Sequence, residues 1–203
     1  MDHLRSRLGA MCGRGASVSP DDLLSRIYRV TTEMLTDRGL TILERSNTIQ
    51  ALEQRILAIE PVLTAHAAQD GQRLTRVLYL AEERVAIRTV RQLMEDASEF
   101  ERTILVSSEG PTPFTNRESV HWGTRVQYFT FKDLLVNVTR HACVPHHRLY
   151  TGIREFPDAQ YPKILTSDRV VQHYDFQPGE LVEIERRFAV CENGPYLRIV
   201  AVG

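Results

Sequence analysis

Leu74-Thr-Arg-Val-Leu-Tyr-Leu80 is a short apolar run in the middle of the chain, and Thr103-Ile-Leu-Val106 is a second one. Short apolar runs bounded by turn residues are typical of buried β-strands. The stretch between them has the spacing of one apolar helix face over 84–94, at Val85, Ile87, Val90 and Met94. A strand, a helix and a strand in this order most easily form a parallel crossover unit with the helix on one face. The sequence therefore predicts an α/β domain in the N-terminal part of the chain.

A capped helix is expected before this unit. It begins at Ser19-Pro20-Asp21-Asp22, because serine can cap a helix, proline suits its first position and acids favour its positive end. It ends at Asp37-Arg38-Gly39, where glycine can adopt the left-handed C-cap conformation. Its apolar face carries Leu23, Ile27, Val30 and Met34. Residues 1–18 mix Arg, Gly, Ser and Met without a clear period, and we interpret them as a flexible N-terminal extension.

A second helix and two further apolar stretches complete the first domain. The helix is expected from Asn47 or Thr48 to about Ala58, and Pro61 disturbs it. Its inward positions are Ile49, Leu52, Ile56 and Ile59. The final apolar stretches lie at 126–131 and 134–138. We place this domain at residues 19–138.

The composition shifts to His, Pro and Tyr after residue 138, and the segments become short. One or two helical turns are expected over 168–174, a turn at 177–180, an exposed strand over 181–185, and a hairpin turn at Asn193-Gly194 leading into a strand over 196–200. We place this second, strand-rich domain at residues 139–203. A unit of this size buries little core and usually needs a disulfide, a bound metal or a partner to be stable.

Charge and lysine content exclude several activities. The chain has 25 Lys plus Arg against 26 Asp plus Glu, and its only lysines are Lys132 and Lys163. Neither follows a glycine, so a phosphate-binding P-loop is excluded. The acid position of a nuclease-type [DE]-x-K motif holds Thr130 or Tyr161 instead, so that site is missing as well. The balanced charge also argues against tight autonomous binding to nucleic acid as the main activity.

The chain is expected to be intracellular. No stretch approaches the 18 or more consecutive apolar residues of a membrane span, and no apolar run of a secretory signal follows the first residues. The three cysteines are odd in number and far apart, which fits free thiols in a reducing compartment.

The sharpest local cluster of possible metal ligands consists of His141, Cys143, His146 and His147. Imidazole and thiolate can bind zinc, but the cluster lacks the usual paired ligand spacing, so we disfavour a metal site. A Cys–His nucleophile is conceivable, although nothing supplies an orienting residue or an oxyanion hole. We therefore interpret Cys143 as a buried structural cysteine. The paired acids Asp21-Asp22 and Glu82-Glu83 are interpreted as residues at helix starts.

Several arginines near the junction of the two domains allow two interpretations. They could face a phosphate backbone, or they could belong to an ordinary solvated surface, which the interspersed acids favour. These arginines are Arg117, Arg125, Arg140, Arg148 and Arg154.

Three colinear segments resemble one protein family. Residues 27–39 end in Asp-Arg-Gly, residues 135–147 contain Asn-x-Thr-x-His and Val-Pro-x-His, and residues 161–186 contain Tyr-Pro-Lys-Ile followed by Pro-Gly-Glu-Leu-Val-Glu-Ile-Glu-Arg. Together they resemble the fifth subunit shared by eukaryotic nuclear RNA polymerases, whose C-terminal half corresponds to a small subunit of archaeal RNA polymerase. The order and spacing agree over about 19–203, and the last seventy residues are the most specific.

The resemblance implies an α/β N-terminal nuclease-like jaw domain plus a small α+β C-terminal assembly domain. Such a subunit is non-catalytic, has no cofactor or metal, docks on the largest polymerase subunit beside small subunits, and places its jaw near downstream DNA. It is neither membrane-bound nor an obligate homo-oligomer. The DNA-proximal residues would be Thr112, Pro113 and Arg117. The assembly residues would be His141, Val144, Pro145, His147, Pro162, Ile164, Asp168, Tyr174, Pro178, Gly179, Arg186 and Arg198.

Departures from the family pattern fall in the assembly domain. Arg169 replaces a proline, Asp175-Phe176 replaces Leu-Gly, residues 188–195 replace a Ser-Glu-Thr-x-Gly segment, and the loop over 150–160 is shorter than usual. A paralogue dedicated to one polymerase, or a subunit from a divergent protist or a large DNA virus, would explain them. The expected location is the nucleus, or the nucleolus for RNA polymerase I, with a virion or viral factory as the alternative. A nuclease on the same fold and a free-standing transcription regulator remain alternative functions.

Overall fold

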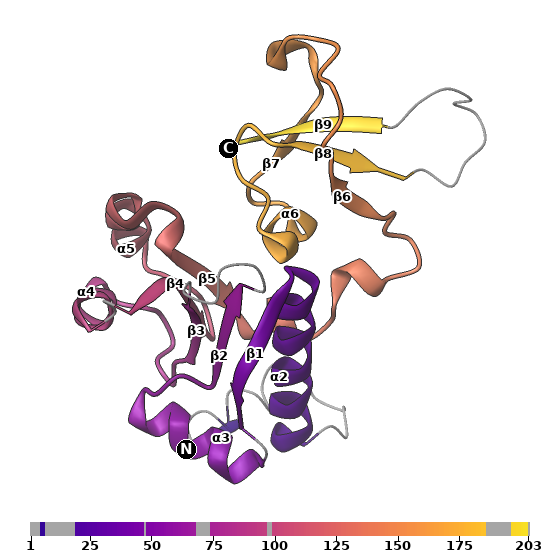
Figure 1. The fold of residues 1–203 in the computed structure, drawn as a ribbon. Helices are drawn as coiled ribbons and strands as arrows, with labels where there is room; N and C mark the ends of the chain where they lie inside the picture. The colour runs from indigo at the N-terminus through magenta and orange to yellow at the C-terminus, as the bar shows by residue number, and fades with distance from the viewer. Residues whose placement is uncertain are drawn as a thin grey trace. The chain divides into compact units, whose positions relative to one another are not determined.

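The chain folds into two compact units, Met1–Val136 and Asn137–Gly203. The computed structural model describes residues 5–6, 19–46, 48–67, 74–96, 99–185 and 196–202, drawn in colour in Figure 1. The expected N-terminal extension lies outside the described residues except for Arg5 and Ser6. The division between the units falls two residues before the boundary expected from the sequence.

The N-terminal unit is built on a five-stranded mixed sheet with strand order β1-β2-β3-β4-β5. The strands β1 to β3 pair antiparallel, whereas β3, β4 and β5 pair parallel. The strands are β1 (Leu40–Arg45), β2 (Leu63–Ala67), β3 (Leu74–Tyr79), β4 (Phe100–Ser107) and β5 (Val126–Thr130), and the helices are α2 (Pro20–Asp37), α3 (Ile49–Ala58), α4 (Ile87–Glu95) and α5 (Pro113–Glu118).

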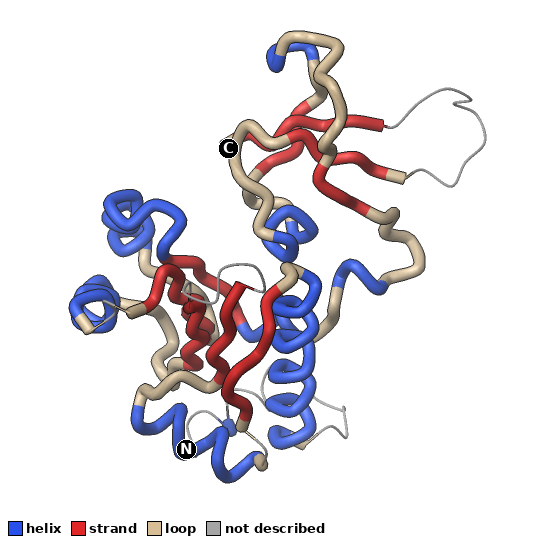
Figure 2. The backbone as a smooth tube through the Cα atoms, in the orientation of Figure 1, coloured by secondary structure: helices blue, strands red, loops and turns tan. Residues whose placement is uncertain are grey.

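Helices cover both faces of this sheet. One hydrophobic cluster joins α2 and α3 to residues such as Val77 and Tyr79 of β3, and the other joins α4 to Leu78 of the same strand. Successive strand residues point to opposite faces, so β3 supplies both clusters. Figure 1 and Figure 2 show α2 on one side of the sheet and α4 with α5 on the other. The predicted α/β character of the N-terminal part is therefore confirmed.

The predicted crossover is present as β3–α4–β4, and its two strands pair in parallel. The helix begins later than expected, at Ile87, because the buried Val85 pairs with Pro111 in an isolated bridge. The acids Glu82-Glu83 therefore precede the helix and do not occupy its first turn, so their interpretation as residues at a helix start was wrong. The carboxylate of Glu82 instead accepts a hydrogen bond from the Thr89 hydroxyl at 3.2 Å.

The helix α2 confirms the predicted caps. The Ser19 hydroxyl accepts a hydrogen bond from the Asp22 backbone N–H at 3.0 Å, and the predicted apolar face is buried. After the helix, Gly39 has a φ of +77°, which favours glycine. Arg38 donates from Nη1 to the Gln127 side chain of β5 at 2.9 Å, so the Asp-Arg-Gly ending ties α2 to the far edge of the sheet.

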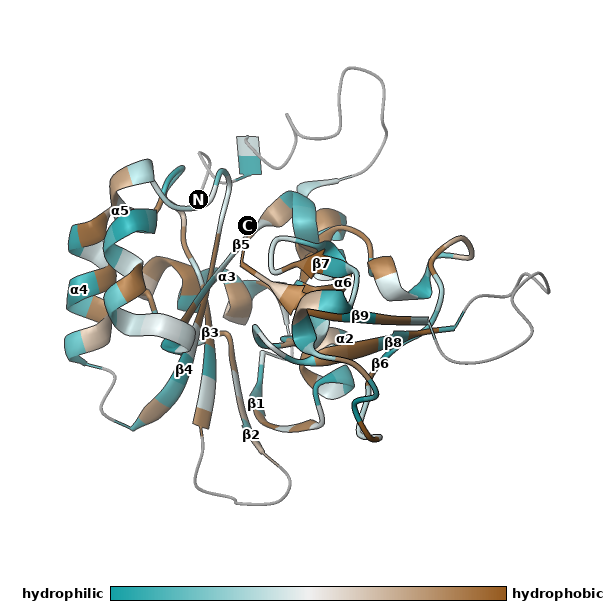
Figure 3. Cartoon of the chain, turned by 90° about the horizontal axis from the view of Figure 1, so that it is seen from above, coloured by the Kyte–Doolittle hydropathy of each residue, from teal (hydrophilic) through white to brown (hydrophobic). Residues whose placement is uncertain are grey.

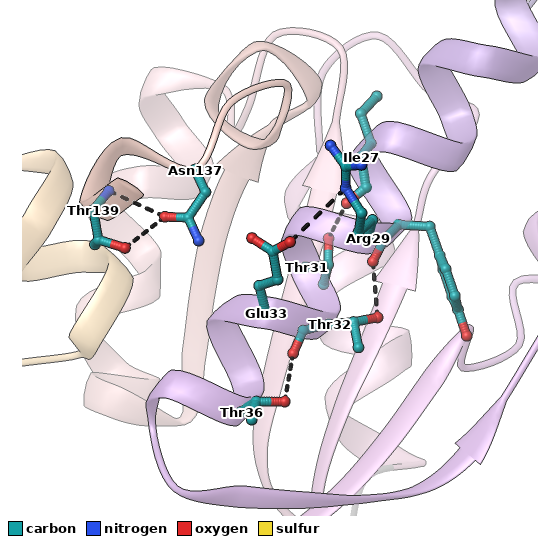
Figure 4. Close-up of polar contacts among 9 residues, drawn as sticks. Ile27, Arg29, Thr31, Thr32, Glu33, Thr36, Asn137 and Thr139 are labelled. Atoms are coloured by element: carbon teal, nitrogen blue, oxygen red, sulfur yellow. Dashed lines mark hydrogen bonds and ion pairs between the residues drawn. The ribbon is translucent and has the colours of Figure 1, made fainter. Parts of the chain in front are cut away.

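Three threonines of the same helix form hydrogen bonds to its backbone. The hydroxyls of Thr31, Thr32 and Thr36 each donate to the backbone carbonyl four residues earlier, at 2.8, 2.9 and 3.0 Å (Figure 4). Bonds of this kind keep a polar side chain compatible with a helix interior. Thr31 is fully buried, and its hydroxyl also contacts the Tyr79 hydroxyl at 2.7 Å.

Residues 40–67 differ from the sequence-based expectation in two respects. Ile59 was expected to face inward, but α3 ends at Ala58, and Ile59 takes a left-handed conformation with 46% of its surface exposed. The strands β1 and β2 were not predicted, because their short runs have weak period-two patterns. The helix start was predicted correctly, with Thr48 as the cap, whereas Asn47 lies outside the described residues.

The C-terminal unit contains a four-stranded sheet with strand order β6-β8-β9-β7. One face packs against the helix, with Ile164, Val171, Val182, Ile184 and Val200 in the cluster, and the other carries Tyr161, Leu181 and Ile199. Figure 3 shows hydrophobic positions along β8 and β9. The strands are β6 (His147–Leu149), β7 (Lys163–Leu165), β8 (Leu181–Ile184) and β9 (Tyr196–Ala201), and the helix is α6 (Arg169–Tyr174).

Most of the predicted elements of this unit are present. The helical turns, the turn at 177–180 and the strand over 196–200 are confirmed. The strand β8 was predicted to be exposed, but Leu181 and Val182 are both buried because β8 lies between β6 and β9. The strands β6 and β7 were not predicted, and the hairpin turn at Asn193-Gly194 lies outside the described residues.

Candidate functional site

Two loops lie side by side after β3 and β4. The Val85 backbone N–H donates to the Gly110 carbonyl at 2.9 Å, and the Thr112 N–H donates to the Val85 carbonyl at 3.2 Å. The buried Thr115 hydroxyl also donates to the Val85 carbonyl, at 3.0 Å. These bonds fix the start of α5 against the loop that follows β3, and so give the loop before α5 a defined shape.

The predicted DNA-proximal residues lie at both ends of the short helix α5, with Thr112 and Pro113 at its start and Arg117 in its last turn. Thr112 caps the helix, since its hydroxyl accepts from the Thr115 N–H at 3.1 Å, and it is half-buried. Pro113 and Arg117 are exposed, and Arg117 Nε donates to the Pro113 carbonyl at 3.4 Å. Phe114, which was not predicted to contribute, is exposed beside them. The helix α5 therefore presents one guanidinium and one aromatic ring to solvent.

Several predicted assembly residues support the C-terminal fold directly. Ile164 is buried in the core, and the Pro162 carbonyl accepts from the Ile199 N–H at 2.9 Å. Asp168 caps α6, accepting from the Val170 N–H at 2.8 Å. Arg198 donates to the Lys163 carbonyl at 3.1 Å and lies 5.2 Å from the centroid of the Tyr196 ring. These side chains hold the unit together, so replacing them tests folding before docking.

The remaining predicted assembly residues lie at or near the surface. Pro178 and Gly179 form an exposed turn, and His141 is exposed, whereas Val144, Pro145, His147 and Tyr174 are half-buried. Arg186 lies outside the described residues. The eleven described residues of this set belong to β6, β7, α6, β9 and the loops between them.

The His and Cys cluster is engaged in local backbone contacts. The Cys143 N–H donates to His141 Nδ1 at 3.2 Å, and His147 Nδ1 donates to the Pro145 carbonyl at 2.7 Å. Cys143 is an exposed free thiol, so its interpretation as a buried structural cysteine was wrong. Within the described part of the chain, no group of three or more His, Cys, Asp or Glu side chains could hold a metal ion.

Asn137 organises the start of the C-terminal unit. Its Oδ1 accepts from the Thr139 N–H at 3.0 Å and from the Thr139 hydroxyl at 2.7 Å (Figure 4). Asn137 is buried, and side-chain caps of this kind fix the direction of the following turn. The Asn-x-Thr pattern at 137–139 thus has a structural role in this chain.

Residues 150–160 form an ordered loop, here called the Ile153 loop. The Tyr161 hydroxyl accepts from the backbone N–H groups of Glu155 and Phe156 at 3.1 and 3.2 Å. Arg154 bonds Asp158 at 2.5 Å and the Gly179 carbonyl at 2.8 Å. The loop presents two apolar side chains to solvent, those of Ile153, which is 85% exposed, and Phe156, which is 53% exposed. Sequence reasoning missed this feature, although the flanking tyrosines were a usable signal.

Arg148 and Glu183 form a bidentate ion pair across β6 and β8. Arg148 donates from Nε and Nη2 to the two carboxylate oxygens at 2.9 and 2.8 Å. These hydrogen bonds lower the pKa of Glu183 below its ordinary value of 4.5. Because the folded pKa is depressed, the pair stabilises the fold at pH values above 4.5, and this stabilisation is lost as the pH falls through the lowered pKa.

An Arg148→Gln variant is therefore expected to raise the pKa of Glu183 back toward 4.5, since the hydrogen bonds to the carboxylate weaken and the positive charge is lost. The pKa can be measured by following the Glu183 carboxyl carbon by NMR during a pH titration. An Arg154→Gln variant is the control, because Arg154 contacts Asp158 and not Glu183. An unchanged Glu183 pKa in Arg148→Gln would contradict this assignment.

Residues 136–200 match the family described as RNA polymerase Rpb5, C-terminal domain. Over these residues the C-terminal unit is similar to this family. The match spans nearly the whole of that unit, and it includes β6, β7, β8, α6, the Ile153 loop and all but the last residue of β9. The resemblance seen in the sequence motifs is thereby confirmed for the part of the chain where those motifs were most specific.

Relatives extend the similarity over most of the chain. It is 23% identical over 185 residues to DNA-directed RNA polymerase V subunit 5A of Arabidopsis thaliana, covering 83% of each protein. It is 23% identical over 208 residues to DNA-directed RNA polymerases IV and V subunit 5B of the same organism, covering 92% of this chain and 95% of the relative. It is 30% identical over 97 residues to DNA-directed RNA polymerases I, II, and III subunit rpabc1 of Dictyostelium discoideum, covering 42% and 49%. Both shared and polymerase-specific subunits are thus among its relatives.

The described departures from the family pattern are accommodated in the helix α6 and the core of the C-terminal unit. Arg169 stands at the first position of α6, where proline is common because that N–H has no partner within the helix, so arginine leaves α6 intact. Asp175 ends the helix with a φ of +61°, a conformation that Asp tolerates better than most residues other than glycine. Phe176 stacks on Tyr174 at 5.3 Å between ring centroids and packs against the core. Residues 188–195 lie outside the described residues.

In the part of the chain that the structure describes, we find no helix with the length and apolar character needed to cross a membrane.

Proposed function

We propose that this chain is a non-catalytic structural subunit of a multisubunit DNA-directed RNA polymerase. The observation that carries the proposal is the match of residues 136–200 to the Rpb5 C-terminal domain family, together with relatives along most of the chain whose names describe polymerase subunits. A non-catalytic role also fits the sequence, because neither lysine stands in a P-loop or a [DE]-x-K motif.

In this proposal the two units have different tasks. The C-terminal domain, which we place at residues 139–203, is an assembly domain that docks on the largest polymerase subunit and lies beside small subunits. The N-terminal domain, which we place at residues 19–138, is a nuclease-like jaw used as a scaffold near downstream DNA. The protein works in the nucleus, as part of a transcribing complex. It draws its affinity for DNA from that complex, which agrees with its formal net charge of −1.

Affinity purification tests the proposal. The full-length chain, tagged and expressed in cells of the organism that encodes it, is expected to recover the two largest polymerase subunits in near-stoichiometric amounts. Mass spectrometry of the largest subunit would then name the polymerase that it serves. Recovery of the tagged chain without those two subunits would overturn the proposal.

Arg117 is the residue that we propose faces the DNA. An Arg117→Gln change is expected to weaken the binding of the assembled polymerase to downstream duplex and to reduce the salt dependence of that binding by about one counterion, since one phosphate contact is lost. Binding can be measured by fluorescence anisotropy over a salt series, with polymerase purified through the variant subunit. Recovery of the polymerase itself should not change.

The matched control is Arg29→Gln, an exposed arginine on α2, on the opposite face of the sheet from α5. It should leave both DNA binding and assembly unchanged. Loss of the polymerase from the Arg117→Gln purification would show that α5 lies in a subunit interface and not at DNA. An equal effect of both changes would mean that general charge, and no particular contact, is responsible.

A further inference from the structure

The Ile153 loop places two large apolar side chains in solvent. Ile153 is 85% exposed and Phe156 is 53% exposed. Single exposed apolar residues are common on proteins and need no explanation. These two differ from scattered exposed residues because they lie three residues apart on a loop whose backbone is held in place. The exposed apolar side chains therefore have a fixed position relative to each other.

The order of the loop comes from contacts within the unit. The Tyr161 hydroxyl accepts two backbone N–H groups, and Arg154 bonds both Asp158 and the Gly179 carbonyl. The Phe156 ring meets the Tyr161 ring edge to face, with 6.0 Å between centroids. A surface that is already ordered loses little conformational entropy when a partner binds.

Gly152 shows how closely the loop is packed. A Cβ atom at this position would lie 2.4 Å from the Tyr150 hydroxyl oxygen, closer than real Cβ atoms approach. The same hydroxyl donates to the Ile153 carbonyl at 3.3 Å. Tyr150 therefore lies over Gly152 and supports the backbone that carries Ile153.

We infer that Ile153 and Phe156 form a protein-docking surface, and that its occupant is an apolar surface of another subunit of the polymerase. This inference rests on the proposed function and specifies which part of the assembly domain makes contact. The family match covers the whole loop, and the proteins similar to this chain are named as polymerase subunits. These similarities favour a neighbouring polymerase subunit as the partner.

The charges of the loop favour a protein over a polyanion as its binding partner. The loop carries one arginine and two acids, Arg154, Glu155 and Asp158, and the arginine is paired with one of the acids. Nucleic acids and anionic membranes attract clusters of positive charge. A small apolar centre within a polar, nearly neutral rim is instead typical of a protein interface.

Ile153→Ser and Phe156→Ser in one full-length chain test this surface. We expect the amount of polymerase recovered per tagged chain to fall at least about tenfold, because buried aromatic and aliphatic anchors dominate interface energy. Val120→Ser is the matched control, since Val120 is 77% exposed but lies in the other unit. It should recover the polymerase like the unchanged chain.

Two further measurements separate docking from folding and from self-association. Circular dichroism and thermal unfolding should be the same for the double variant and the unchanged chain. In addition, a photo-crosslinking amino acid at position 153 should link the otherwise unchanged chain to a polymerase subunit, whatever the serine changes do to stability.

The outcomes are distinguishable. If the unchanged chain recovers polymerase and the double variant recovers as much, the docking surface is refuted while the proposed function stands. Crosslinks that join only two copies of this chain would assign the surface to self-association and would also overturn the inference. If the unchanged chain recovers no polymerase, the proposed function itself fails.

Discussion

Replacing Phe131 by alanine is expected to lower the free energy of unfolding of the N-terminal unit by about 3–5 kcal/mol. Phe131 is fully buried where β5 ends, in the cluster formed by α2, α3 and four strands. Its ring meets the Tyr79 ring edge to face, with 6.0 Å between centroids and planes 82° apart. The change removes a whole ring and leaves a cavity that the packed elements around it cannot fill.

A buried hydrogen bond beside Phe131 limits how far the core can relax into the cavity. The Tyr79 hydroxyl is hydrogen-bonded to buried Thr31 at 2.7 Å, and burial raises the pKa of Tyr79 above its ordinary value. A Tyr79 ring that moved into the new cavity would break this bond, and a buried hydroxyl without a partner is costly. The cavity should therefore remain largely open, which places the expected effect toward the upper part of its range.

Urea unfolding measures this effect directly. Trp122 is the only tryptophan of the chain and packs against the core on the α4 side, so its fluorescence follows the N-terminal unit. Phe131→Leu is the matched control and should cost less than about 1.5 kcal/mol, because most of the volume is kept. Equal midpoints for the alanine and leucine variants would show that Phe131 is not part of a tightly packed core.

The elements that the sequence predicted are those with strong local signals. The caps of α2, the order of β3, α4 and β4, and the helical turns over 168–174 each depend on residues within a few positions of one another. The strands that were missed depend on distant partners. β1 lies at an edge with most residues exposed, and β6 and β7 have three residues each, so their pairing with β2, β8 and β9 could not be recognised locally.

For the candidate site as well, local sequence patterns could be recognised from the sequence, whereas tertiary properties could not. The motifs that suggested the family could be recognised because they are residue patterns, and the match at 136–200 agrees with them. The exposure of a side chain is a tertiary property, and the errors at Ile59, Cys143 and β8 are all errors of exposure. The surface at Ile153 was missed for the same reason, since its order depends on Tyr161 and on the carbonyl of Gly179.

A Gly179→Val change is the second substitution for which we expect a large effect. It should lower the free energy of unfolding of the C-terminal unit by about 2 kcal/mol and remove the chain from the polymerase. Gly179 has a φ of +87°, which a β-branched residue adopts only with strain. The turn cannot relax easily, since the Gly179 N–H donates to the Val200 carbonyl at 2.9 Å and its own carbonyl accepts from Arg154. A small unit has little stability to lose, so a change of this size unfolds a sizeable fraction of it.

A Gly179→Asn variant separates backbone strain from the effect of adding a side chain. Among the described residues, no atom lies within 4 Å of the place where a Cβ would stand, so neither side chain meets a clash there, and asparagine tolerates positive φ far better than valine. We expect Asn to keep most of the thermal stability and most of the polymerase recovery, whereas Val loses both. If both variants are stable but neither recovers polymerase, the surface of the turn itself contacts the partner. If valine is as stable as glycine, the positive φ is not required, and Arg154 must be held to the turn in some other way.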